Sequence, residues 1–205
     1  MIQGTDEWRA ARLGKPSASR ISDMLAEGKG SAMATTREDY LYELVCERLT
    51  GKPYEQFHRA PSWIEDGTEN EALARGTYEV KTGQIVTEHP GKDDGPIPGF
   101  WASPDGLILP GGGLEVKCPK TKKHFKTMMT GKIDTPYIYQ MTGNLINFEA
   151  EWWDFVSFDP ALPDNLCYWC KRFTRAELPV QLVTDGIKRF MAELDELTEK
   201  LRKME

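Results

Sequence analysis

The sequence contains little cysteine, little histidine and no long hydrophobic run. Its four cysteines among 205 residues are too few and too scattered for a disulfide framework, which favours a reducing, cytoplasmic setting. No apolar run reaches the ~18 residues that a membrane-spanning helix requires, and no signal-peptide pattern opens the chain. We therefore expect a cytoplasmic protein without a membrane partner.

A zinc or redox site also finds little support. Cys167 and Cys170 form one Cys-x-x-Cys pair, but no second pair accompanies it and the three histidines fit no ligand spacing. In an extended strand the two thiols would point to opposite faces. The sequence therefore predicts core cysteines at these two positions.

Basic residues are fewer than acidic ones, with 26 Lys and Arg against 32 Asp and Glu. The formal net charge is −6, which argues weakly against a general nucleic-acid binder. However, residues 117–132 contain six lysines, one histidine and no acid. Such a run is either a solvated surface or the path of a polyanionic substrate. The lysines are Lys117, Lys120, Lys122, Lys123, Lys126 and Lys132.

The composition, with 40% hydrophobic and 28% charged residues, predicts one domain over residues 1–205. Ser17 is the expected N-cap of the second helix. Apolar spacing and end signals predict helices at 5–14, 17–28, 36–51, 64–81, 135–148 and 184–205. Alternation predicts strands at 83–90, 99–109, 114–118, 151–160 and 165–174. This order predicts an α/β fold with a mixed sheet.

Two acids and a lysine gather in the stretch "WASPDGLILPGGGLEVKCPK". On an extended strand Glu115 and Lys117 share one face, while Leu114 and Val116 take the other and can enter the core. The pair is either a surface ion pair, worth only ~0–1 kcal/mol, or part of a site. A strand-turn-strand would return Asp105 toward Glu115. With a simple turn at 110–113, however, Asp105 falls on the opposite face, so the site requires a bulge, a bend or a shifted turn.

Two close carboxylates repel each other unless a cation lies between them, and oxygen ligands suit Mg²⁺ or Mn²⁺. A metal with a nearby lysine suits phosphodiester hydrolysis, because the metal polarises the phosphate and lowers the pKa of a bound water. The lysine can orient or deprotonate that water, or neutralise the transition state. This pattern favours a nuclease over a structural hairpin.

The motifs resemble a known family. "SPDG" followed by "LEVKCP" resembles the D…ExK core of the PD-(D/E)xK nucleases, and more narrowly the lambda-exonuclease-like (YqaJ) viral recombinase group. "WRAARLGKPSASR", "DGTENEALARGTYE" and "YIYQ" resemble three further motifs of that family, in the same order. The resemblance extends from about Trp8 to Pro160. It implies a restriction-endonuclease-like core, in which helices flank a central mixed sheet.

The resemblance implies a role for each matching residue at the metal site. Asp105, Glu115 and the backbone carbonyl of Val116 would hold the metals, with Lys117 as the catalytic lysine. Glu71 matches a further metal-site carboxylate. From spacing alone, Glu71 would instead form an ion pair four residues along the chain.

A phosphate pocket is implied as well. Arg12 matches an arginine that binds the 5′-phosphate of a DNA end. Ser17 and Ser19, at a predicted helix N-terminus, could complete that pocket. The resemblance also implies a phosphate contact at Ser103. Lys120, Lys122 and Lys123, in the lysine run that continues from Lys117, are expected to contact DNA.

The fourth motif departs from the family pattern YxxQxQ, since Gln140 is present but Thr142 replaces the second glutamine. Either Gln140 supports the lysine or Thr142 takes part of that duty.

The resemblance implies a Mg²⁺-dependent 5′→3′ exonuclease, with Mn²⁺ as a substitute and two metals in the site. It would degrade one strand of linear duplex DNA to mononucleotides and leave 3′ single-stranded tails. A homotrimeric ring, a single-strand-annealing recombinase partner and a phage or prophage origin are implied too. The alternatives are an endonuclease or Cas4-like nuclease of the same superfamily, and a non-catalytic module that binds DNA ends.

Overall fold

The computed structural model describes residues 1–28, 33–54 and 67–204. Within these residues the helices alternate with a small sheet, as the sequence predicts. Residues 64–66 of the predicted helix at 64–81 lie outside the described residues. The elements are α1 (Asp6–Arg12), η1 (Ala18–Arg20), α2 (Ile21–Met24), α3 (Thr35–Thr50), α4 (Gly67–Thr82), β1 (Gly106–Ile108), β2 (Gly112–Lys117), α5 (Thr121–Thr130), α6 (Thr135–Asn147), β3 (Trp152–Phe158), β4 (Tyr168–Thr174) and α7 (Val180–Arg202).

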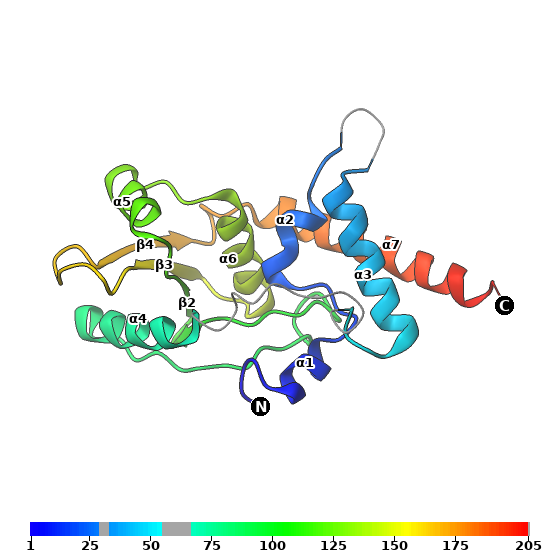
Figure 1. The fold of residues 1–205 in the computed structure, drawn as a ribbon, viewed down its shortest axis with the longest axis horizontal. Coiled ribbons are helices and arrows are strands. Elements are labelled where there is room, and N and C mark those ends of the chain that lie inside the picture. The colour runs from blue at the N-terminus through cyan, green and yellow to red at the C-terminus, as the bar shows by residue number, and fades with distance from the viewer. Residues whose placement is uncertain (29–32, 55–66, 205) are drawn as a thin grey trace.

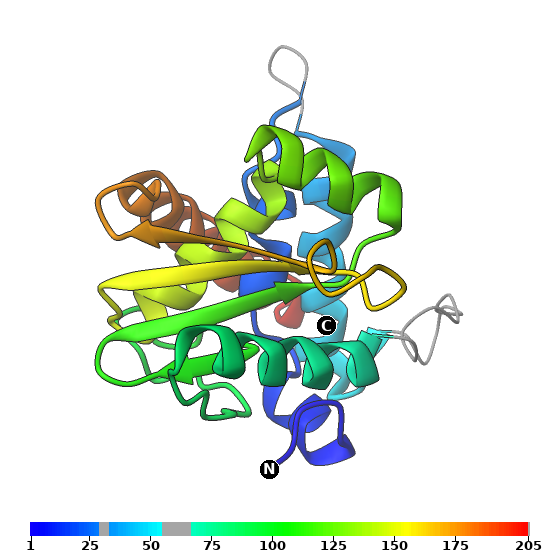
Figure 2. The same ribbon diagram turned by 90° about the vertical axis from the view of Figure 1, so that its left-hand side faces the viewer.

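The four strands form one mixed sheet in the order β1-β2-β3-β4 (Figure 2). β1 and β2 are antiparallel, β2 and β3 are parallel, and β3 and β4 are antiparallel. The parallel pair requires a crossover connection, which α5 and α6 supply. The predicted α/β fold with a mixed sheet is confirmed.

Helices cover both faces of the sheet. On one face, Ala74 and Tyr78 of α4 pack with Leu114 and Val116 of β2. On the other face, α6 packs against strand residues such as Trp153. The alternation of β2 therefore buries its apolar side chains under α4 and turns Glu115 toward α6.

A third apolar cluster joins η1, α2, α3 and α7. Figure 1 shows α3 and α7 at one end of the molecule, the sheet with α4 at the other, and α6 between them. Gly143 of α6 permits a close approach, since a Cβ there would lie 2.3 Å from Ile21 Cδ1. α6 is therefore fixed against α2 on one side and against the sheet on the other.

Three predicted elements are shorter than the sequence suggests. The helix predicted at 17–28 is a single 3₁₀ turn followed by the short α2. Of the strand predicted at 83–90, Thr87 makes an isolated bridge to Leu107. Only 106–108 of the segment 99–109 forms a strand, while Trp101 and Ala102 make isolated bridges. No helix in the described part of the chain has the length and apolar character to cross a membrane.

Candidate active site

The hairpin between β1 and β2 brings Asp105 beside Glu115. The register pairs Gly106 with Leu114 and Ile108 with Gly112, so the turn is 109–111 rather than 110–113. Extended by one residue, this register sets Asp105 opposite Glu115, on the same face of the sheet. The offset that the site requires therefore comes from a shifted turn.

Glu115, Lys117 and Asp105 form a buried charged cluster. The carboxylates of Glu115 and Asp105 are 0% and 7% exposed. Lys117 Nζ lies 2.5 Å from Glu115 Oε1, and the backbone N–H of Val116 donates to Asp105 Oδ2 at 2.7 Å. The Glu115 side chain of this ion pair is fully buried and that of Lys117 is 23% exposed, so the pair differs from the fully solvent-exposed pair that the sequence left open.

Glu71, in the first turns of α4, adds a third carboxylate. Burial raises its pKa to about 7, and the charge of Asp105 adds to the rise. The ion pair with Arg75 that spacing alone favours does not form among the described residues, and Arg75 pairs with Glu88 at 2.7 Å. The Glu71 carboxylate is close enough to Asp105 and Lys117 for both charges to shift its pKa.

Burial and mutual repulsion set the protonation of this cluster. Burial raises the pKa of Glu115 to about 8, and Asp105 and Glu71 add to the rise while Lys117 opposes it. Burial also raises the pKa of Asp105. For Lys117, burial alone would lower the pKa, but Glu115 and Asp105 outweigh it and raise the pKa well above the ordinary 10.5. Lys117 is therefore an ammonium at any working pH.

These shifts predict a pH-dependent stability in metal-free buffer. The pKa of Glu71 and of Glu115 is about 7 and about 8 in the folded chain, against an ordinary value of 4.5. The folded state therefore binds more protons, and stability falls as pH rises from about 4.5 to about 8. We expect the melting temperature to fall by a few degrees between pH 5.5 and 8.5. Thermal melting in chelator-treated buffer tests this, and Glu115→Gln should flatten the profile.

Asn144 of α6 is the contact that the sequence did not reveal. It is 0% exposed, and its Nδ2 donates to Glu115 Oε2 at 3.2 Å. Thr142 is buried and donates its hydroxyl to Ile138 O within α6; whether Gln140 or Thr142 supports Lys117 stays a prediction. Gln140 lies half-buried one turn before Asn144, on the same side of the helix.

The donor set suits a hard divalent cation. The charge of Asp105 raises the pKa of both Glu71 and Glu115; a positive ion would relieve this repulsion, and Mg²⁺ and Mn²⁺ prefer oxygen ligands. In the part of the chain that the structure describes, no three His, Cys, Asp or Glu side chains are gathered so that they could hold a metal ion. One oxygen of Glu115 is instead paired with Lys117. The metal-ligand roles of Asp105, Glu115, Glu71 and Val116 stay predictions.

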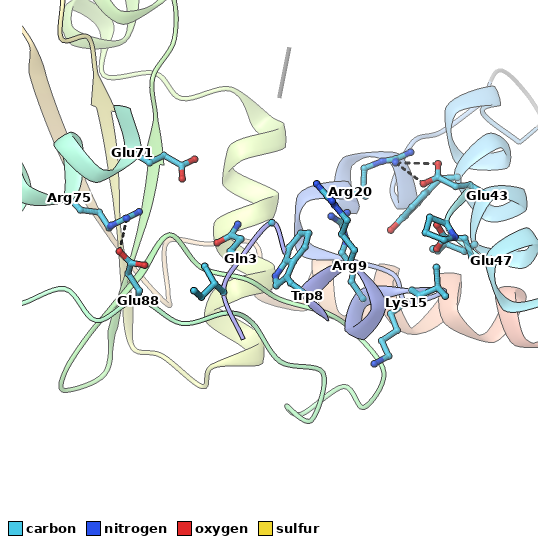
Figure 3. Close-up of a pocket in the computed structure, with 17 residues that line it drawn as sticks. Gln3, Trp8, Arg9, Lys15, Arg20, Glu43, Glu47, Glu71, Arg75 and Glu88 are labelled. Atoms are coloured by element: carbon cyan, nitrogen blue, oxygen red, sulfur yellow. Dashed lines mark hydrogen bonds and ion pairs between the residues drawn. The ribbon is translucent and has the colours of Figure 1, made fainter. Parts of the chain in front are cut away.

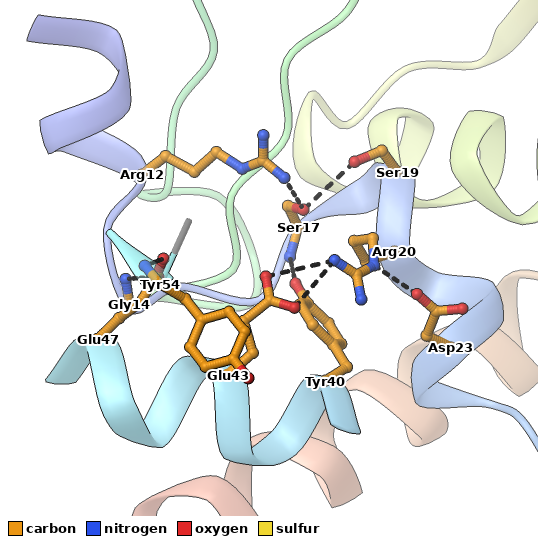
Figure 4. Close-up of polar contacts among 10 residues, drawn as sticks. All are labelled: Arg12, Gly14, Ser17, Ser19, Arg20, Asp23, Tyr40, Glu43, Glu47 and Tyr54. Atoms are coloured by element: carbon orange, nitrogen blue, oxygen red, sulfur yellow. Dashed lines mark hydrogen bonds and ion pairs between the residues drawn. The ribbon is translucent and has the colours of Figure 1, made fainter. Parts of the chain in front are cut away.

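A second polar cluster lies where α1, η1 and α3 meet (Figure 4). Arg12 Nη2 donates to Ser17 Oγ at 3.1 Å, and Ser17 Oγ lies 3.4 Å from Ser19 Oγ. The backbone N–H of Ser17 donates to the Tyr40 hydroxyl at 3.1 Å. Ser17 caps no helix with its side chain, contrary to expectation. The grouping of Arg12 with both serines is nevertheless present.

Arg12 and Arg20 differ in how their charges are compensated. Arg20 pairs with Asp23 and with Glu43, and it lies 4.0 Å above the Tyr40 ring. Among the described residues no carboxylate lies within ion-pair distance of Arg12, whose guanidinium lies 5.3 Å from the centre of the Trp8 ring. Arg12 is thus the guanidinium in this cluster that is placed to accept an anion.

One cavity of about 470 Å³ is lined both by Arg12 of the second cluster and by Glu71, whereas Asp105, Glu115 and Lys117 do not line it (Figure 3). Arg12, Arg20 and Tyr40 line one part of it, and Glu71 and Arg75 line another. An anion at Arg12 would therefore lie in the same cavity as the Glu71 side of the charged cluster.

The remaining predicted contacts lie around this centre. Ser103 donates to Pro90 O at 2.9 Å and is 3.4 Å from Trp8 Nε1. Lys120 and Lys122 are exposed at the start of α5. Lys123 pairs with Asp134 at 2.7 Å, so part of its charge is already compensated. Cys167 is buried and Cys170 half-buried, and both are free thiols.

The model of the YqaJ-like viral recombinase domain matches residues 7–150. Among solved structures, the alkaline exonuclease LHK-Exo from Laribacter hongkongensis is 40% identical. The match covers 97% of each chain, with a TM-score of 0.87. The structure of LHK-Exo in complex with dAMP gives 40% identity, 97% coverage of each chain and a TM-score of 0.86.

A more distant match shows the fold alone. A phage-related exonuclease from Haemophilus somnus 129PT is 15% identical, with a TM-score of 0.64 and coverage of 91% of this chain and 96% of that one. No curated protein sequence matches the chain.

Proposed function

The chain belongs to the YqaJ-like viral recombinase domain family and is a deoxyribonuclease of the alkaline-exonuclease type; from that premise we propose that it is a Mg²⁺-dependent 5′→3′ exonuclease on linear duplex DNA. The observation that carries the proposal is one cavity that both Arg12 and Glu71 line. A terminal phosphate at Arg12 would share this cavity with Glu71, whose charge interacts with Asp105 and Lys117 of the charged cluster.

Asp105 and Glu115, with Glu71 and the carbonyl of Val116, would hold the metal, and the buried acids fit Mg²⁺ in kind. When bound, the metal supplies Lewis acidity and a more acidic water. Lys117 contributes a permanent positive charge, because its carboxylate neighbours raise its pKa. We assign it to neutralising the charge that develops on the phosphate, rather than to removing a proton.

The polarity of digestion is proposed from the phosphate cluster. Arg12 has a guanidinium without a carboxylate partner among the described residues and holds Ser17, which lies beside Ser19. A fork of N–H donors of this kind binds a phosphate dianion. A 5′-terminal phosphate bound at Arg12 would direct the first phosphodiester bonds of the same strand toward Glu71. Binding of dAMP by a relative supports a mononucleotide product.

The test is digestion of linear duplex DNA labelled at one 5′ end, with and without Mg²⁺, beside a covalently closed circle. Early release of labelled mononucleotide from the linear form, with the circle intact, is the expected result. A nicked circle would replace the proposal with an endonuclease. A gel shift on DNA ends without cleavage in Mg²⁺ or Mn²⁺ would leave a non-catalytic end-binding module.

Arg12→Ala should blunt the preference for phosphorylated ends. Loss of a charge-assisted phosphate contact is worth about 1.5–3 kcal/mol, so the rate on 5′-phosphate ends should fall roughly 10- to 100-fold. The rate on 5′-hydroxyl ends should change little, because that contact is already absent. Initial rates on the two substrates measure the ratio, with Arg202→Ala at the far end of α7 as a matched control. An equal loss on both ends would remove Arg12 from the pocket.

The assembly and the setting are part of the proposal. The family description as a viral recombinase supports a phage or prophage origin, a cytoplasmic location in a bacterial host and a single-strand-annealing recombinase as partner. A homotrimeric ring would keep an acidic chain on DNA by enclosing the duplex. Light scattering of the purified protein, with and without a DNA end, tests the trimer.

A further inference from the structure

Asn144 occupies a position where an apolar residue would pack at lower cost. Its side chain is 0% exposed, and its Oδ1 is buried without a hydrogen-bond partner. A buried unpaired acceptor costs about 1–3 kcal/mol. Leucine, which has the same number of side-chain heavy atoms and the same branching, would avoid that cost. We therefore look for the reason for an asparagine in its side-chain nitrogen, Nδ2.

That other atom, Nδ2, donates to Glu115 Oε2 at 3.2 Å. Lys117 Nζ approaches the opposite oxygen, Oε1, at 2.5 Å. Glu115 is thus held from both sides, and its carboxylate plane is fixed by one group from its own strand and one from α6. A carboxylate without the amide could rotate about its terminal torsion, which has a broad energy well.

The helix that carries Asn144 is itself fixed. Gly143 packs so closely on α2 that a Cβ would lie 2.3 Å from Ile21 Cδ1, and Leu145 is buried against the sheet. Asn144 therefore presents its amide from a backbone that cannot readily shift. A rigid donor of this kind is what orients a ligating carboxylate in metal sites.

We propose that Asn144 is a positioning residue that orients the Glu115 carboxylate for metal binding. The inference rests on the proposed function, because it takes Glu115 as a metal ligand. Asn144 touches neither substrate nor metal and acts through Glu115 alone. Its removal should therefore weaken Mg²⁺ binding and slow turnover while leaving the binding of a DNA end unchanged.

α6 supplies a matched control in Asn147. It too is 0% exposed and has a buried Oδ1 without a partner. Its Nδ2 donates at 2.9 Å to Lys92 O, a backbone carbonyl outside the charged cluster. Asn144→Leu and Asn147→Leu thus exchange the same groups on the same helix. Only the first removes a contact to Glu115.

The experiment measures the melting temperature of the purified protein against Mg²⁺ concentration without DNA, which reports metal binding independently of cleavage. In Asn144→Leu we expect the half-saturating Mg²⁺ concentration to rise about 10- to 100-fold, as for other residues that orient metal ligands. Asn147→Leu should keep the wild-type midpoint. In cleavage assays Asn144→Leu should lower kcat about 10-fold or more at an unchanged KM for DNA ends.

Equal Mg²⁺ midpoints in wild type and Asn144→Leu would overturn the inference while leaving the proposed function intact. A wild-type protein with no Mg²⁺ or Mn²⁺ response would overturn the metal site, and with it both proposals. If Asn144→Leu fails to fold, Asn144→Ala decides between the outcomes, because it leaves a space for water without adding bulk. An unshifted midpoint in Asn144→Ala would overturn the inference in the same way.

Discussion

Lys117→Met is expected to reduce cleavage of linear duplex DNA about 10³-fold, with binding of DNA ends unchanged within a factor of about three. The estimate follows from the loss of one preorganised charge at a site where negative charge develops on a phosphate. Methionine keeps most of the length of the lysine stem, so packing over Tyr137, whose ring centre lies 5.4 Å from Nζ, should survive. Single-turnover rates and gel shifts on 5′-phosphorylated ends separate the two effects.

The same variant tests how the lysine acts. If Lys117 were a general base, its rate contribution would increase as pH approached its pKa, which its acidic neighbours raise well above the ordinary 10.5. A purely electrostatic role predicts instead that the ratio of wild-type to variant rates stays constant from pH 7 to 9. Lys188→Met, exposed on α7, is the control. Retention of more than about a tenth of the activity by Lys117→Met would remove Lys117 from the active site.

Much of the fold could be predicted because its signals are local. The apolar spacing of 184–205 and the alternation of 151–160 gave α7 and β3, and Gly51 ends α3 in the left-handed conformation (φ 66°) that glycine adopts readily. The strand predicted at 83–90 and the first part of the strand predicted at 99–109 failed for a non-local reason. Outside β1, these segments form only isolated bridges, and β-structure depends on a partner that local pattern does not specify.

The charged cluster could be predicted in composition but not in geometry. The spacing of Glu115 and Lys117 placed them on one face, whereas the position of Asp105 depended on the turn, which lies at 109–111 rather than at 110–113. Asn144 could not be found from sequence, because an asparagine inside an apolar helix resembles a capping or packing residue until its neighbour is known. Its spacing of four from Gln140 was the one available signal.

Asp105→Asn should separate metal binding from folding more sharply than any other change. The asparagine Oδ1 can still accept the N–H of Val116, which donates to Asp105 at 2.7 Å, so the hairpin should keep its register. Cleavage should nevertheless fall about 10³-fold, because a metal site loses a charged ligand and the electrostatic stabilisation it supports. Rates at saturating DNA, across a Mg²⁺ and a Mn²⁺ series, measure this loss.

Thermal melting of the same variant distinguishes a lost ligand from a damaged fold. In wild type, Mg²⁺ at a hundredfold excess over Kd should stabilise the protein by about 2.7 kcal/mol, or roughly 5–10 °C. Asp105→Asn should lose most of that stabilisation by Mg²⁺.

Without metal at pH 8, however, Asp105→Asn should melt at the same temperature as wild type or higher, since it removes one of the carboxylates that raise the pKa of Glu115. A misfolded variant would melt below wild type both with and without Mg²⁺. A smaller stabilisation by Mg²⁺ together with an unchanged or higher metal-free melting temperature would therefore indicate a missing ligand and relieved repulsion. Glu196→Gln, exposed on α7, should show neither change, and an undiminished Mg²⁺ response in Asp105→Asn would place the metal elsewhere.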